Sequence, residues 1–126
     1  MMSVARFLFT DDEDRPELRD SFKGFVGPGI FGADKLLDDV AKALNFPAYF
    51  GENWNALFDC LRDFNWIEEQ RICLIHKEVP SIEVEDLKTY LEILRDAVND
   101  WKDGEDHEFF VLLPASSEER VRSLLQ

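Results

Sequence analysis

Two hydrophobic patterns alternate along this chain: short, largely apolar runs, and longer segments in which apolar residues recur at helical spacing. Three short, largely apolar runs predict β-strands at 4–10, 71–76 and 108–113. Three longer segments have apolar residues at helical spacing and predict amphipathic helices at 33–44, about 53–64 and about 83–101. Strands that alternate with helices imply crossover connections, so the pattern predicts an α/β fold with a small parallel sheet.

Residue types with known preferences for helix ends sharpen these boundaries. Asp34 is the expected N-cap of the first helix, and Pro47 stops that helix. Asn53 is the expected N-cap of the second helix. The spacing of Ser116 and Glu119 forms a capping box, which predicts an additional short helix at the C-terminal end.

Residues 21–32 mix aromatic and aliphatic side chains with four glycines. The Pro28-Gly29 pair is a turn signal, so we expect short extended pieces on either side of it. The aromatic side chains of this segment have three open interpretations: additional core, an interface between copies of the chain, or a second contact surface. The acidic run 11–14 is expected to be a solvated turn.

Length and charge limit the function. The chain has 126 residues, of which 45% are hydrophobic, and this suits one domain spanning 1–126. Its formal charge of −13 argues against direct binding to nucleic acid or to an anionic membrane, because contacts with phosphate need Lys and Arg. A cationic protein partner fits this charge, although acidity that serves only solubility explains it equally well.

The sequence has no apolar run near the roughly 20 residues that span a membrane and no signal peptide, so we expect a cytoplasmic location. Cys60 and Cys73 lie in apolar neighbourhoods and are expected to be buried thiols. Neither has the spacing of a zinc site, and we expect no metal or other cofactor.

An enzyme is the alternative to a binding protein. Cys60, His76 and His107 offer a nucleophile and two bases, but the sequence lacks the motifs that assemble such groups in known hydrolases and phosphoryl-transfer enzymes. We therefore expect no catalytic residues.

The most informative segment is 46–64, an aromatic loop that leads into a helix with several polar positions. Residues 47–61 match the pattern P-x-Y-[YF]-G-x-N-x-[DN]-A-L-x-D-C-L, which resembles the barstar family of intracellular ribonuclease inhibitors. The resemblance is strongest over 36–64, whereas residues 1–32 and 114–126 depart from it. It implies a three-layer α/β/α fold with a three-stranded parallel sheet and flanking helices, to which this chain adds the C-terminal helix.

The resemblance also implies an interaction with a basic ribonuclease. Asp59 stands where the family places the carboxylate that fills the cationic active-site cleft, and Asn55 lies one turn earlier on the same helix face. The family's contact loop corresponds to Tyr49, Gly51 and Asn53. Weaker correspondences place three further residues near the contact surface: Phe58, Phe64 and Asp96.

Each of these residues also has a purely structural interpretation. Asp59 and Asp96 would then be solvated helix carboxylates, and the aromatic residues would be core. A third possibility is a barstar-like module that binds a different partner or a second copy of itself.

Two residues depart from the family pattern. Asn55 replaces an aspartate and so lacks a negative charge. Arg62 shares the face of Asp59, so we expect it to pair with Asp59 and to repel a basic nuclease. The hypothesis that follows is a ribonuclease with a neutral or acidic group opposite Arg62.

Overall fold

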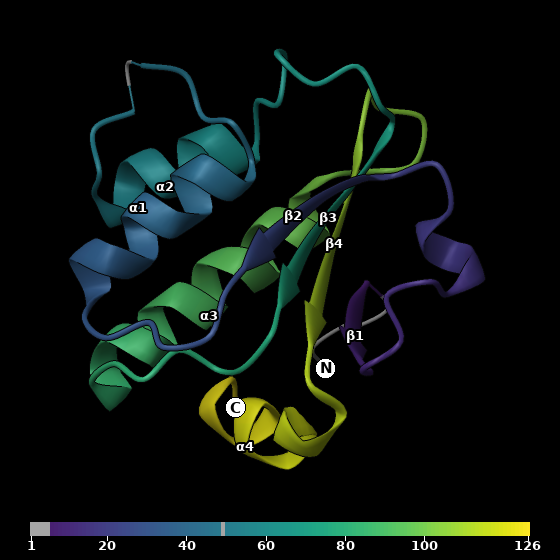
Figure 1. Cartoon of the computed structure of the whole chain (residues 1–126). Helices are drawn as coiled ribbons and strands as arrows, with labels where there is room; N and C mark the ends of the chain where they lie inside the picture. The colour runs from purple at the N-terminus through teal and green to yellow at the C-terminus, as the bar shows by residue number, and fades with distance from the viewer. Residues whose placement is uncertain (1–5, 49) are drawn as a thin grey trace.

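The computed structural model describes residues 6–48 and 50–126. In chain order the elements are β1 (Phe7–Phe9), the 3-10 turn η1 (Pro16–Leu18), β2 (Phe22–Val26), α1 (Ala33–Ala43), α2 (Trp54–Leu61), β3 (Arg71–His76), α3 (Val84–Asp100), β4 (Glu108–Leu113), the 3-10 turn η2 (Ala115–Ser117) and α4 (Glu118–Leu124) (Figure 1). In this part of the chain, no helix combines the length and the apolar character needed to cross a membrane.

The sheet is parallel throughout, with strand order β1-β4-β3-β2. The predicted parallel α/β fold is therefore confirmed, but the sheet has four strands rather than three. The additional strand is β2, which lies in the glycine-rich segment 21–32 and pairs with β3 from Phe22 to Val26. The first strand is also shorter than predicted, since β1 covers Phe7–Phe9 only.

β2 is one of the short extended pieces expected around Pro28-Gly29, and Gly24 explains why the pattern does not predict a full strand there. A Cβ atom at this position would lie 2.6 Å from the Ala43 carbonyl oxygen, at the end of α1. Only glycine allows the helix backbone to approach the strand this closely. The residue that weakens the strand signal is thus the residue that lets α1 pack on the sheet.

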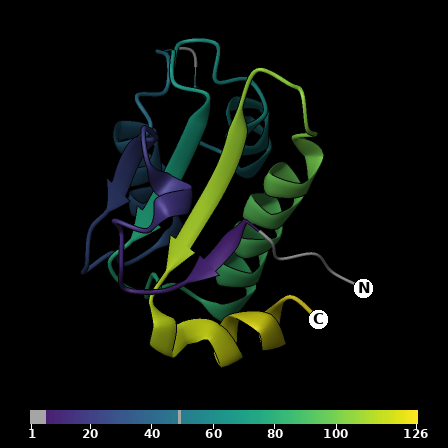
Figure 2. The ribbon, with the colours of Figure 1, turned by 90° about the vertical axis from the view of Figure 1, so that its right-hand side faces the viewer.

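One face of the sheet carries the main core. Figure 1 shows α1, α2 and α3 on this face, and all four α helices contribute buried side chains to it. Alternate strand residues point into this core, as illustrated by Ile72 and Leu74 of β3 and by Phe109 and Val111 of β4. α4 lies beyond the end of β4, at the bottom of the molecule in Figure 2.

The opposite face of the sheet has a much thinner cover. The intervening strand residues form a second buried cluster with Leu18 of η1: Cys73, Ile75, Phe110 and Leu112. Leu18 is fully buried and is the part of η1 that seals this face. The third layer of the expected α/β/α arrangement is therefore a single 3-10 turn, with no α helix among the described residues on that side.

Several predicted helix ends need correction. The N-cap of α1 is Gly32, at φ 88°, and Asp34 lies within the first turn. The capping box is also wrong, because the residue before α4 is Ser117, whose hydroxyl donates to the Pro114 carbonyl instead of capping the helix. Asn53, by contrast, is confirmed as the N-cap of α2.

Candidate functional site

The loop before α2 is held from the inside by aromatic packing. Phe46 packs edge-to-face against Phe50 and Trp66, with ring centroids 4.9 and 5.9 Å apart. The Trp66 indole Nε1 donates to the Leu44 carbonyl at 2.9 Å, which ties the end of α1 to the chain that follows α2. These contacts fix the path of the loop, while Tyr49, a predicted contact residue, lies outside the described residues.

Asn53 organises the start of α2. Its Oδ1 accepts a hydrogen bond from the Ala56 backbone N–H at 2.8 Å, and its Nδ2 donates to the Gly51 carbonyl at 3.3 Å. The left-handed residue of this turn is Glu52, at φ 53°, rather than Gly51. Gly51 instead provides space, since a Cβ atom there would come within 3.3 Å of Asn53 Nδ2. Asn53 is thus a structural cap as well as an exposed group.

The outer face of α2 presents two predicted contact residues to solvent. Asn55 and Asp59 are both exposed and lie one turn apart, while Leu57 and Leu61 are fully buried on the inner face. Asp59 makes no ion pair with any residue that the structure describes. Its carboxylate is therefore available to an external cation.

Glu52 adds a negative charge that the motif pattern does not reveal. It occupies a variable position of that pattern, and its side chain is exposed beside Asn53. Glu52 also contributes to the raised pKa of Lys42, which is caused mainly by its hydrogen bond with Asp38. The signal that would have found Glu52 is its place between Gly51 and Asn53, the two residues that shape the turn.

The two aromatic contact candidates differ. Phe58 is half-buried and packs against the main core, so part of its ring remains at the surface of α2. Phe64 is fully buried and packs against Trp101 and Phe109, with ring centroids 6.3 and 5.4 Å away. Phe64, a predicted contact residue, is therefore not available at the surface: α2 ends at Leu61, and the chain places Phe64, at φ 51°, in the core.

Comparison with protein families agrees with this geometry. The model of the family described as Barstar (barnase inhibitor) matches residues 23–114, well over half of the chain. The chain belongs to the barstar family. A search of curated proteins gives no match.

The barstar match assigns the elements to two groups. The matched residues contain β3, β4 and all of β2 except Phe22, so three of the four strands lie within the match. The match begins at Lys23, which corrects the prediction that all of residues 1–32 depart from the family. β1, η1, η2 and α4 lie outside the match.

Asp96, the predicted contact residue on α3, already forms an ion pair within the domain. It is exposed on α3, and its carboxylate pairs with Arg95 at 3.0 Å. Although α3 packs against α2, no hydrogen bond or ion pair joins Asp96 to Asp59 within the described residues. The structure thus brings Asn53, Asn55 and Asp59 together on one surface, with Asp96 on the adjacent helix.

Arg62 takes a different role from the predicted one. Its guanidinium lies over the Trp101 ring at 4.1 Å, and its nitrogens pair with Asp100 at 2.5 Å and with Glu105 at 3.7 Å. The predicted pairing with Asp59 is therefore wrong. Two carboxylates already offset the charge of Arg62, so the structure gives no reason to expect an acidic group opposite it in a partner.

Arg62 instead links the ends of α2 and α3. It is the C-cap residue of α2, and Trp101, on which it stacks, donates its indole N–H to the Leu61 carbonyl at 2.8 Å. Arg62 Nη1 is buried and has no hydrogen-bond partner in the described part of the chain. The aromatic stacking and the Asp100 pair must therefore offset the desolvation of this atom.

The candidate catalytic residues are not brought together. His107 precedes β4 and His76 ends β3, so the two lie at opposite edges of the parallel sheet. Cys60 is buried on α2, and burial raises the pKa of its thiol. Among the described residues, no group of three or more His, Cys, Asp and Glu has the arrangement of a metal site.

His76 has a structural role. Its Nδ1–H donates to the Leu112 carbonyl at 2.9 Å, so its Nε2 accepts the Tyr90 hydroxyl proton at 2.6 Å. Burial lowers the pKa of His76 to about 4 and raises the pKa of Tyr90. Both side chains are neutral at pH 7 and join β3, β4 and α3 in the core.

Proposed function

We propose that this chain inhibits a basic, barnase-type ribonuclease by docking the loop 50–53 and the outer face of α2 into the active-site cleft. The observation that carries the proposal is the Asp59 carboxylate: it is exposed, makes no ion pair with the residues that the structure describes, and lies on a helix whose other side is fixed in the core. A ribonuclease cleft is built to hold phosphate, so a fixed carboxylate can pair with its Arg, Lys and His side chains. Membership of the barstar family supports this assignment.

Charge supports the same partner. The chain carries 27 acidic and 14 basic residues, and Glu52 places a further carboxylate beside the α2 face. An acidic surface attracts a basic protein over long range, which accelerates association at low ionic strength. The proposal places this interaction in the cytoplasm, where the inhibitor would protect the producing cell, and it involves no cofactor.

The test is a titration of a barnase-type ribonuclease with the purified chain at low and high salt. We expect inhibition that weakens with salt, because screening reduces the association rate. Asp59→Ala should weaken inhibition by about 30-fold or more, the loss typical of a central hot-spot residue.

A matched control separates contact from total charge. Glu119→Ala removes one exposed carboxylate from α4, which lies away from α2 in both ribbon views (Figures 1 and 2). It should change inhibition by about twofold or less. Equal losses in the Asp59 and Glu119 variants would reject docking through α2, and no inhibition by the wild-type chain at micromolar concentration would reject this class of ribonuclease as the partner.

A second candidate is self-association, which the aromatic segment 21–32 suggested. Phe25 and Phe31 are 44% and 72% exposed, and Val84, three residues after the bridge partner of Phe31, is 59% exposed. Mass measured by light scattering over a range of concentrations tests it. A dimer that Phe31→Asp or Phe25→Asp dissociates would favour self-association, whereas a constant monomer mass would reject it.

A further inference from the structure

A polar pocket of about 370 Å³ opens at the amino edge of the sheet, away from α2. Four residues line it: Arg19 and Asp20, which follow η1, and Gln70 and Arg71, where the chain enters β3. Its volume falls within the range of small-molecule sites. The first two residues lie outside the barstar match and the last two lie inside it, so the pocket is formed jointly by the matched domain and the segment that precedes it.

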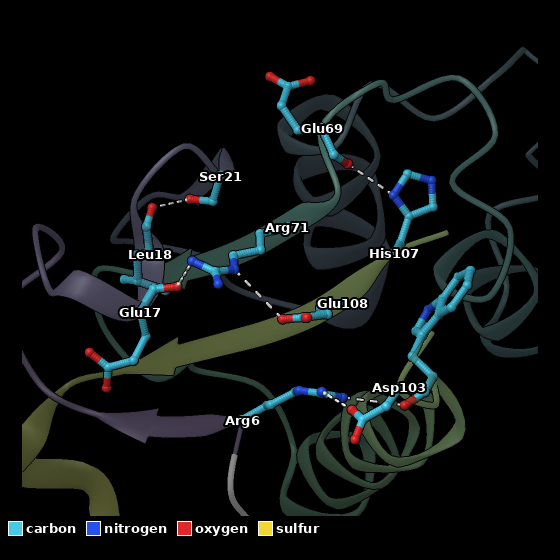
Figure 3. Close-up of polar contacts among 10 residues, drawn as sticks. Arg6, Glu17, Leu18, Ser21, Glu69, Arg71, Asp103, His107 and Glu108 are labelled. Carbon is cyan, nitrogen blue, oxygen red and sulfur yellow. Dashed lines mark hydrogen bonds and ion pairs between the residues drawn. The ribbon is translucent and has the colours of Figure 1, made fainter. Parts of the chain in front are cut away.

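The turn that presents Arg19 and Asp20 is well anchored. Leu18 is buried in the second core cluster, and the Ser21 hydroxyl donates to its carbonyl at 2.6 Å (Figure 3). The Arg19 backbone N–H donates to the Pro16 carbonyl at 3.2 Å, and Asp20 adopts a left-handed conformation at φ 58°. The Arg19 backbone is therefore held in place beside β3.

The positive charge in the pocket is poorly neutralised. Figure 3 shows the Arg71 guanidinium between the Glu17 carbonyl, 3.4 Å from Nη1, and the Glu108 carboxylate, 3.7 Å from Nε. Both distances are at the outer limit for such contacts. Arg19 makes no ion pair with any described residue.

Apart from Glu108, three acidic residues of this region, Glu17, Glu69 and Asp20, do not neutralise the two arginines. Glu17 pairs with Arg15 at 2.6 Å, and this hydrogen bond lowers the pKa of the Glu17 carboxyl. The Glu69 side chain points away from Arg71 (Figure 3). Asp20 lines the pocket but lies beyond ion-pair distance of both arginines.

We propose that this pocket binds a phosphate group, through Arg19 and Arg71. Guanidinium groups bind phosphate oxygens with paired, charge-assisted hydrogen bonds, and two of them around one pocket match a dianion. Gln70 and Asp20 supply an amide and a hydrogen-bond acceptor, which suit hydroxyl groups on a phosphate ester. The site is independent of the α2 surface.

The experiment is an NMR titration of the full chain with sodium phosphate at constant ionic strength, in which backbone amides and arginine Nε–H signals are followed. We expect saturable shifts confined to residues 19–21 and 70–71. Arg19→Gln and Arg71→Gln should each weaken binding about tenfold, the value of one charge-assisted contact. Arg19→Gln removes no ion pair, so the test survives if the Arg71 variant folds poorly.

Two further variants sharpen the result. Arg122→Gln removes a half-buried arginine from α4, where it pairs with Glu118, and should leave phosphate binding unchanged. Asp20→Asn removes a like charge while keeping a residue type that tolerates φ 58°, so it should tighten phosphate binding about two- to threefold. Shifts spread over the whole chain without saturation, or equal losses in the Arg122 and Arg19 variants, would overturn the site.

The source of the phosphate group is decided by a second titration. Ribose 5-phosphate that binds more tightly than inorganic phosphate, and loses this advantage in Asp20→Gly, which removes the acceptor and tolerates φ 58°, would assign the pocket to a phosphorylated hydroxy compound. Equal binding of the two would assign it to free phosphate.

Discussion

One face of the sheet lies under three helices and buries side chains from every strand, whereas the other face is closed by a 3-10 turn and one fully buried leucine. The helix-covered face lies almost entirely within the barstar match, and it carries α2 with its exposed Asp59. The thinly covered face is closed by Leu18, which lies outside the match. The proposed contact surface therefore rests on the thick layer, and a segment outside the barstar match closes the thin one.

The largest effect is expected in the core beneath α2. Phe64→Ala removes a fully buried ring that packs against Trp101 and Phe109, and it should lower the free energy of unfolding by about 3–5 kcal/mol. Chemical denaturation measures this loss. Phe31→Ala is the matched control: its ring is 72% exposed, and the change should stay within about 0.5 kcal/mol. Equal losses would refute the assignment of Phe64 to the core.

Acid should destabilise the helix-covered face through His76. Its pKa is about 4 in the folded chain, below the ordinary value of 6.5, so the unfolded chain binds the proton more readily. The stability from neutral His76 is full above pH 6.5 and is lost as the pH falls from 6.5 to about 4, by about 3 kcal/mol in total.

Comparison with His76→Gln isolates this contribution. Protonation of carboxylates changes the unfolding free energy of both proteins between pH 7 and pH 4. Only the wild type also contains the buried imidazole. The wild type should therefore lose more stability between the two pH values than the variant. Identical losses in the two proteins would contradict the assignment.

Leu18→Ala tests the thin face. The change removes the buried side chain that seals the second cluster, and it should lower the free energy of unfolding by about 2 kcal/mol. Hydrogen exchange should accelerate in residues 15–22 while the amides of α2 and α3 stay protected, because the two faces are covered by separate segments. Faster exchange in α2 would show that the two faces open as one unit.

The smallest expected effect is the difference in stability loss between substitutions at two asparagines, Asn53 and Asn55. Asn53→Ala removes the side chain that caps α2 and should lower the free energy of unfolding by about 1 kcal/mol. Asn55→Ala, on the exposed face of the same helix, should change stability by about 0.5 kcal/mol or less. Thermal unfolding compares them, and a larger loss in the Asn55 variant would reject the capping role.

Sequence reasoning succeeded where a local signal and the tertiary structure agree. The continuous apolar runs of β3 and β4 and the helical spacing in α3 gave those elements to within a residue or two. Asn53 was identified because a cap is a local interaction. β2 was not assigned as a strand, since Gly24 serves a contact with α1 that lies 19 positions further on, at Ala43.

Contacts between residues far apart in the sequence explain why the positions of Arg62 and Phe64 differ from those predicted. Arg62 follows Asp59 at a spacing that puts it on the contact face of α2 if the helix continues, whereas Phe64 was a contact candidate only through the family resemblance, since its spacing from Leu57 and Leu61 suits burial. The helix ends at Leu61, and both side chains then find partners near Trp101, far away in the sequence. Asn55 and Asp59 remained on the exposed face because they lie within the helix, where spacing alone fixes direction.

The contact between Gly24 and the end of α1 limits how this domain can evolve. Since the strand meets the helix backbone to backbone, with no side chain between them, α1 cannot be moved outward or inward by exchanging one apolar residue for another. The loop before α2 therefore always starts from the same point in space. If the proposed function holds, a lineage that follows a changing partner must adapt through substitutions on this loop and on α2, one side chain at a time, while α1 stays where it is.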